Sequence, residues 1–136
     1  MSAFSVYFAN KVIDHMLRNQ AFTPPTTVYL ALFTAVTGLE TDAPTAEVSG
    51  DTYARQACAL DAAASSASAN TSEVAFPQAG ASWGTITHFA LVDHETNVTW
   101  GTNVHVLKHG ALTTSKAIGA GDTLKVAASA LAISIA

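Results

Sequence analysis

The chain has 136 residues, a formal net charge of −4 and only 12% charged residues, against the ~25% usual in soluble domains. This length suits one domain with its own hydrophobic core, and the single cysteine, Cys58, excludes an internal disulfide and a cysteine-based zinc site. Lys and Arg are scattered singly, so we expect no direct nucleic-acid binding, and no segment approaches the roughly 20 apolar residues of a membrane span. A surface so poor in charge favours association with other subunits, because charge repulsion and hydration keep monomers apart. An Ala- and Thr-rich domain that is soluble by itself is an equally good interpretation of the composition.

Residues 2–18 predict the one helix of the chain, because their apolar side chains recur at helical spacing. Ser2 is the predicted N-cap, Asn19 is a predicted left-handed stop, and two prolines follow. A helix so rich in aromatic residues must lie on the sheet or on a neighbouring subunit. The apolar stripe consists of Phe4, Phe8, Val12 and Met16, widened by Val6, Ile13 and Leu17.

The remainder of the chain predicts about eight short strands at roughly ten-residue spacing, separated by turn residues. Residues 83–93, WGTITHFALVD, are the predicted central strand, because most side chains on both of its faces are apolar or small. A strand buried on both faces needs neighbouring strands and a second layer. The other predicted strands are 28–33, 53–60, 71–76, 98–107 (as 98–100 and 104–107, broken by a bulge or bend at Gly101), 111–118, 123–127 and 130–135.

Two segments are predicted to lie outside regular structure. Residues 37–51 form a loop of about fifteen residues, a length that in a compact domain usually marks a functional or partner-ordered loop or arm. The low-complexity stretch 62–70, AAASSASAN, predicts a turn or arm because its serines weaken a helix. Residues 1–136 are therefore expected to form one mainly β domain, a β-sandwich or jelly-roll-like fold of antiparallel strands, with an N-terminal amphipathic helix in 1–20.

The titratable residues do not cluster in a way that predicts chemistry. His105 and His109 are four apart in strand and turn sequence, which places them ~13 Å apart, too far to share one ion. His88 is expected to be a core or interface histidine, and His94 lies in a predicted turn. The acids lack the spacing of a calcium loop, and no serine has the context of a nucleophile elbow. We therefore expect a protein that is not an enzyme, with no cofactor and no metal site.

Six phrases of the sequence, in this order, carry a family resemblance. They are NKVIDHML, AFTPPTTVYLALFTA, VSGDTYARQACAL, TSEVAFPQA, WGTITHFALVD and GALTTSKAIGAGDTLKVAASAL. Together they cover nearly the whole chain, and the sequence is similar to small structural proteins of tailed bacteriophages, described as tail-fibre-like or minor virion proteins. The resemblance implies a non-enzymatic assembly module of the virion and a homo-oligomer, with a trimer favoured.

Three roles are compatible with this resemblance. As a tail-fibre or baseplate component, the favoured role, the chain would use its helix for docking or trimerisation. As a capsid cement or decoration protein, it would bridge subunits of the major capsid protein, which suits a chain without a fibrous shaft or coiled-coil heptads. A host-glycan-binding module would need exposed aromatic residues at loop tips, for which Trp100 is the candidate. The virion proteins are expected to assemble in the host cytoplasm, because the segment MSAFSVYFANKV does not resemble a secretory signal.

The residues predicted to carry the interface with other virion proteins are apolar side chains of the helix and of the 37–51 loop. Aromatic side chains on a helix are stronger candidates than a loop, because interface hot spots are enriched in aromatic residues. The predicted interface residues are Phe4, Tyr7, Phe8 and Val12 on the helix, and Leu39 and Val48 in the loop.

Overall fold

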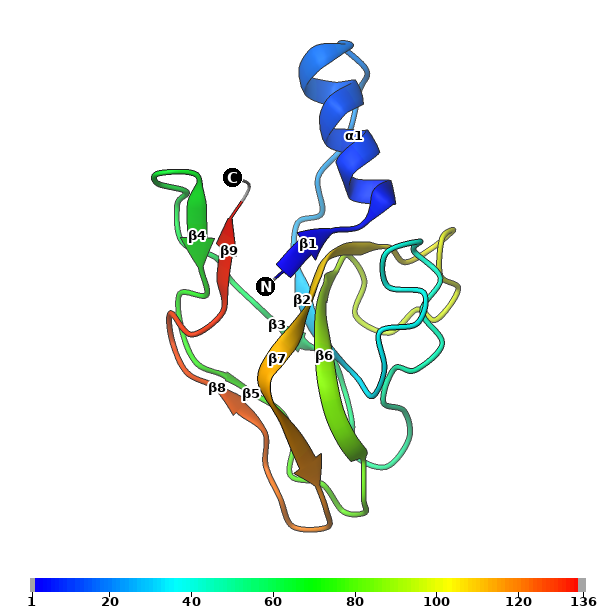
Figure 1. Ribbon diagram of the computed structural model, residues 1–136, viewed down its shortest axis with the longest axis vertical. Coiled ribbons are helices and arrows are strands. Elements are labelled where there is room, and N and C mark those ends of the chain that lie inside the picture. Colours follow the sequence, from blue (N-terminus) through cyan, green and yellow to red (C-terminus); the bar gives the residue numbers. More distant parts are fainter. Residues whose placement is uncertain (1, 135–136) are drawn as a thin grey trace.

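The computed structural model describes residues 2–134, which form a mainly β structure with one helix near the N-terminus (Figure 1). The expected mainly β fold of antiparallel strands with an N-terminal helix is thereby confirmed. No helix within the described residues is long and apolar enough to cross a membrane. The elements are β1 (Ser2–Phe4), α1 (Val6–Leu17), β2 (Tyr29–Phe33), β3 (Gln56–Ala57), β4 (Ala67–Ala69), β5 (Val74–Ala75), β6 (Gly84–Val92), β7 (Val106–Ile118), β8 (Lys125–Val126) and β9 (Ala132–Ser134).

The main sheet has five strands in the order β1-β7-β6-β2-β3, so the predicted central strand does lie at its centre. β6 pairs antiparallel with β2 on one side and with β7 on the other. Two further ribbons, β4 with β9 and β5 with β8, form beside this sheet.

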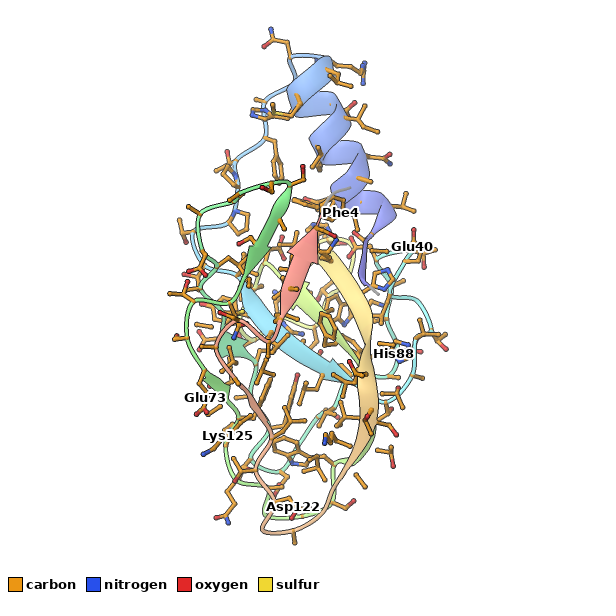
Figure 2. All side chains as sticks on the ribbon, turned by 60° about the vertical axis from the view of Figure 1, so that its left-hand side comes forward. Phe4, Glu40, Glu73, His88, Asp122 and Lys125 are labelled. Carbon is orange, nitrogen blue, oxygen red and sulfur yellow. The ribbon has the colours of Figure 1, made fainter. Side chains whose placement is uncertain are left out.

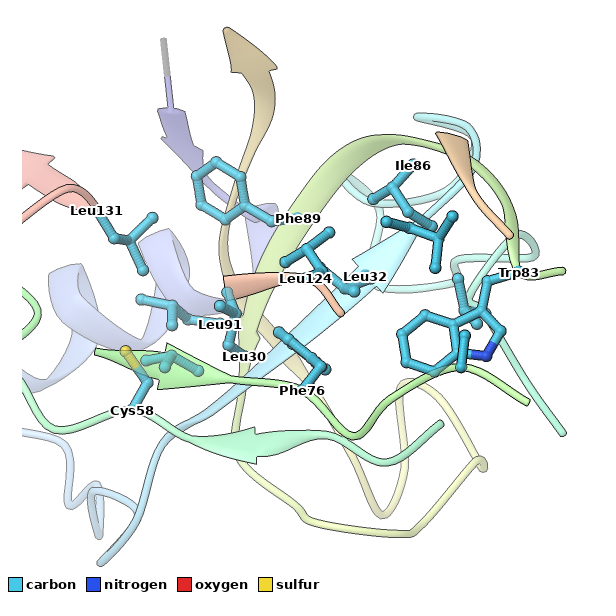
Figure 3. Packing of buried hydrophobic residues seen from close by; sticks show 14 residues of the cluster. Leu30, Leu32, Cys58, Phe76, Trp83, Ile86, Phe89, Leu91, Leu124 and Leu131 are labelled. Atoms are coloured by element: carbon cyan, nitrogen blue, oxygen red, sulfur yellow. The ribbon is translucent and has the colours of Figure 1, made fainter. Parts of the chain in front are cut away.

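Alternate residues of β6 enter two separate hydrophobic cores, which explains why both of its faces are apolar. Phe89 and Leu91 belong to the large core (Figure 3). This core includes side chains of the main sheet and of the segments that form the two ribbons. Ala90 and Val92 belong to a second, smaller core with Phe33. The sheet is therefore covered on both sides, as in a sandwich-like arrangement.

The helix begins four residues later than the sequence predicts. Ser2 is not its N-cap, because residues 2–4 form β1 and pair with β7, with Ser2 opposite Gly110. Ser5 is the N-cap: its hydroxyl accepts a hydrogen bond from the backbone N–H of Phe8 at 3.1 Å and donates one to the carbonyl oxygen of Val106. Asn19 has a φ of 54°, which confirms the predicted left-handed stop.

Three other predicted segments differ from the structure. The predicted strand at 53–60 is reduced to β3, because Arg55 turns inward and pairs with Glu47. The serine-rich stretch at 62–70 contains β4, which follows a tight turn and pairs with β9. The predicted strand at 98–107 is mostly loop, with one bridge between Trp100 and Val104 before β7 begins.

Candidate assembly surface on the N-terminal helix

Helix α1 projects from one end of the β body (Figure 1). It packs against β7 and β1, and none of its residues is buried. A helix of this length is marginal in water without tertiary packing. Its stability therefore depends on the contacts at its base and on whatever covers its apolar side.

The exposed apolar residues of α1 form a single stripe along the helix. The exposed fractions are 47% for Val6, 50% for Ile13, 70% for Met16 and 80% for Leu17. With Ala9, the positions 6, 9, 13 and 16 have the spacing of a and d residues over two heptads. The charged residues of the helix and its C-cap, Lys11, Asp14 and Arg18, lie off this stripe, and Arg18 pairs with Asp14 at 2.6 Å.

The four residues that the sequence predicts for an interface on the helix are half-buried, and three of them pack against the rest of the chain. Phe4 lies in β1 and not on α1, because the helix begins only at Val6. Phe8 contacts Phe4 edge-on, with ring centroids 5.0 Å apart, and lies 6.5 Å from Phe22 of the segment that returns beside the helix. Tyr7 stacks on His105 at 3.8 Å, and Val12 is half-buried. Contacts of these residues with a partner remain a prediction. The large apolar side chains of α1 that are exposed are Met16 of the predicted stripe and the three residues that were predicted to widen it, Val6, Ile13 and Leu17.

The two loop residues of the predicted interface lie in the hydrophobic cores. Leu39 is 0% exposed in the small core, and Val48 is 6% exposed in the large core. The loop follows the end of β2, where the N–H of Val48 donates to the carbonyl oxygen of Leu32 at 3.0 Å. These side chains therefore stabilise the body and are not available on an exposed surface. The apolar content of the loop alone did not distinguish a loop that packs on its own sheet from a loop that becomes ordered on a partner.

Acid–histidine pairs connect the 37–51 loop to β7 at the base of the helix. Asp42 pairs with Nδ1 of His105 at 2.6 Å and also accepts the backbone N–H of Val106 at 2.6 Å. Glu40 pairs with Nε2 of His109 at 2.9 Å. Figure 2 shows Phe4 and Glu40 at the end of the body from which the helix projects. The pairs thus hold the loop against the strand that supports the helix.

Tyr7 connects the helix itself to these pairs through its stacking on His105. Burial raises the pKa of the Tyr7 hydroxyl, and the nearby carboxylates of Asp93 and Asp42 raise it further. The phenol therefore stays neutral at physiological pH and packs as an aromatic ring. Within residues 2–134, no group of three or more His, Cys, Asp or Glu side chains is arranged to hold a metal ion.

Two other residues considered for function have structural contacts. The ring of His88 is half-buried, with Nδ1 2.8 Å from the hydroxyl of Thr87, and burial followed by the charge of His109 lowers its pKa. Trp100 packs on Phe33, with centroids 6.2 Å apart, and lies 4.9 Å from the guanidinium of Arg55. Its ring therefore fastens the loop before β7 to the body and is not an exposed aromatic at a loop tip.

The chain is thus a mainly β body with a projecting helix that carries an exposed apolar stripe. Residues 3–134 match the family model described as Podophage GP4 fiber I protein gp80. The chain belongs to this family, so it is a phage fibre protein, and the resemblance to tail-fibre-like virion proteins is confirmed. A search of curated proteins finds no match.

Proposed function

We propose that this chain is a non-enzymatic assembly component of a podophage tail fibre or baseplate, and that its copies associate through the exposed stripe of α1. The single observation that carries this proposal is the stripe of Val6, Ile13, Met16 and Leu17, which are large apolar side chains 47–80% exposed on one side of a projecting helix. Burying such side chains between subunits contributes about 1.5–3 kcal/mol for each one that becomes fully covered.

The spacing of the stripe favours another copy of the same helix as its partner. β-branched residues occupy the two a-like positions, Val6 and Ile13, and Ala9 and Met16 occupy the d-like positions. Leu17 and the half-buried Val12 flank this seam and widen it, which suits more than two helices, so a trimer is the favoured state. Self-association also brings no like charges together, because the charged residues lie off the stripe.

The contacts at the base prepare the helix for association. Ser5 caps its first turn, Tyr7 stacks on His105, and β1 joins it to the main sheet. A helix held in place loses less conformational entropy when it binds, so a short seam can be sufficient. The fibre named in the family description supports a place in the tail over a role as capsid cement.

The test is the oligomeric state of the intact chain and of a double variant, Ile13→Ser with Leu17→Ser. We expect the wild-type protein to sediment as an oligomer and the double variant as a monomer. Because both side chains are at least half exposed, the β body of the variant should stay folded, which the β-sheet signal in circular dichroism and a cooperative thermal transition would show.

The matched control is Val98→Ser, which removes an apolar side chain that is 73% exposed but lies far along the chain from the helix. This variant should remain an oligomer. A wild-type protein that stays monomeric up to millimolar concentration would contradict the proposal. Deletion of residues 1–20 is a poorer test, because it also removes β1 from the main sheet and the buried Ser5.

A further inference from the structure

A groove of about 540 Å³ lies between the second half of β7 and β8, which diverge from the turn at the lower end of the molecule (Figure 1). Residues 112–118 supply one wall and residues 123–126 the other. The apolar side chains that line the groove belong to the large core or pack against it. They are Leu112, Ile118, Leu124 and Val126.

The groove runs along an edge of β7 that is largely unpaired within residues 2–134. One edge of β7 pairs with β6, and no residue of β6 lines the groove. The other edge pairs with β1 only at residues 108–110. On this second edge, residues 111–118 of β7 therefore continue past the end of β1 with no described strand paired to them. An unpaired edge presents a row of backbone N–H and C=O groups to which another strand can bind.

β7 is also irregular where it borders the groove. Its pairing with β6 shifts between His88 opposite Ala111 and Ile86 opposite Lys116, so residues 112–115 have no ladder partner among the described strands. This shift marks a β-bulge or irregularity in β7 next to the free edge.

The charge on the groove is positive, although the chain as a whole carries −4. Lys116 lines it from the side of β7 and Lys125 from the side of β8, and both residues are exposed. No Asp or Glu is found among the described residues that line it. A ligand with carboxylates at its edges and apolar groups at its centre would match both lysines and the apolar floor.

We propose that this groove binds an extended, acidic peptide segment of another virion protein, which adds as a strand to the free edge of β7. Backbone hydrogen bonds to residues 111–118 would supply affinity, and alternate side chains would pack on Leu112 and Ile118. Carboxylates on the segment would pair with Lys116 and Lys125. The site is separate from the helix stripe, so it concerns a second type of contact beyond self-association.

The register of β1 allows the groove to be tested within one chain. β1 runs antiparallel to β7 with Ser2 opposite Gly110, so residues joined in front of residue 1 would run along the free edge toward Ile118. We would add the extension Thr-Glu-Thr-Val-Thr-Val there, which places its valines opposite Leu112 and Thr114 and its glutamate opposite Lys116. The expected result is a rise in Tm of about 3 °C or more and slower hydrogen exchange of the backbone amides in residues 112–117.

Two matched extensions separate strand addition from other effects. The extension Pro-Glu-Pro-Val-Pro-Val has the same charge but lacks the N–H donors that would face β7, because the N–H of Ser5 sets which alternate residues of this strand bond to β7, and it should give no rise in Tm. The extension Thr-Lys-Thr-Val-Thr-Val should give a smaller rise, because it places a like charge opposite Lys116. If the acidic extension changes neither Tm nor exchange, the groove does not accept a strand and the proposal is overturned.

The second arm uses the free, fluorescein-labelled peptide Thr-Glu-Thr-Val-Thr-Val and measures its anisotropy. We expect saturable binding to the wild-type protein and at least about tenfold weaker binding to the Lys116→Glu, Lys125→Glu double variant. The variant Lys11→Glu, on the helix, should bind as the wild type does. Absence of binding overturns the proposal. So does equal binding of the proline-containing peptide with full displacement by dextran sulfate, because the groove would then be a site for anions and not for a strand.

Discussion

At the scale of single residues, Asp51 shows how one carboxylate can fix a long loop. Its Oδ2 atom accepts hydrogen bonds from the backbone N–H of Gly80 at 2.7 Å, from that of Ala81 at 3.1 Å and from Nε1 of Trp83 at 3.0 Å. Hydrogen bonds from the backbone of Thr52, from Ala81 and from Trp83 lower the pKa of Asp51 from 3.8 to about 2. The carboxylate thus joins the end of the 37–51 loop to the segment that leads into β6.

We expect Asp51→Asn to destabilise the protein near neutral pH and to lose this effect in acid. The folded-state pKa is lower than the unfolded value, so the ionised carboxylate stabilises the fold above pH 3.8, and this contribution disappears as the pH falls toward about 2. The amide retains an acceptor oxygen but not the charge that strengthens these bonds. Urea unfolding followed by tryptophan fluorescence should show a difference in midpoint that narrows over this pH range.

The control for this variant is Asp61→Asn, which removes an exposed carboxylate from another part of the chain. It should have the wild-type midpoint at every pH. A gap between Asp51→Asn and the wild type that stays constant down to pH 2 would show that the charge of Asp51 does not stabilise the fold.

At the scale of elements, the 37–51 loop packs on the body, and its backbone adopts left-handed conformations at two glycines. Gly38 has a φ of +81°, and a Cβ atom at this position would lie 2.0 Å from the carbonyl oxygen of Ala43. The N–H of Ala43 donates to the carbonyl oxygen of Gly38 at 2.9 Å, which closes the turn. Gly50, at the other end of the loop, has a similar φ of +77° but has no atoms within 4 Å of such a Cβ.

These two glycines provide a matched test of the loop. Gly50→Ala should cost about 1–2 kcal/mol, the usual penalty for a side chain in the left-handed region. Gly38→Ala should cost more, about 3 kcal/mol or above, because the backbone around Ala43 must also move. Urea denaturation of both variants measures the difference. Equal destabilisation would indicate that the loop moves aside easily and is not packed as described.

At the scale of the whole molecule, the large core joins parts of the chain that are far apart in sequence. It contains the thiol of Cys58 and the indole of Trp83, which reach it from opposite ends of the 57–84 segment (Figure 3). Burial raises the pKa of the Cys58 thiol, so little of the reactive thiolate is present in the folded protein. Reaction of this thiol therefore reports the opening of the core.

We expect a disulfide reagent to label native Cys58 at least about a hundredfold more slowly than the unfolded chain, because labelling requires opening. As urea increases, the labelling transition should coincide with the fluorescence change of the tryptophans, as for a cooperative domain. The variant Val98→Cys adds a second thiol at an exposed position, which should react at once. Rapid reaction of Cys58 in the native protein would contradict a single closed core.

The features predicted correctly are those that local periodicity encodes. The apolar or small side chains on both faces of 83–93 identified the central strand, and the spacing of apolar residues identified the helix, although its start was misplaced. Both patterns depend only on residues close together in the sequence. The helix pattern already included Ile13 and Leu17, which belong to the exposed stripe.

Only the tertiary structure decided which apolar residues face inward and where the helix begins. The backbone of Ser5 bonds to Leu107, Asp42 pairs with His105, and the N–H of Val48 bonds to Leu32. These partners lie many positions apart in the sequence, so no local pattern predicts them. Hydrophobicity alone also does not show whether a side chain packs against its own sheet or against another subunit. The sequence by itself therefore determined the type and order of most elements. The long-range pairing of backbone and side chains decided that Leu39 and Val48 belong to the cores, and it left the stripe on the helix exposed.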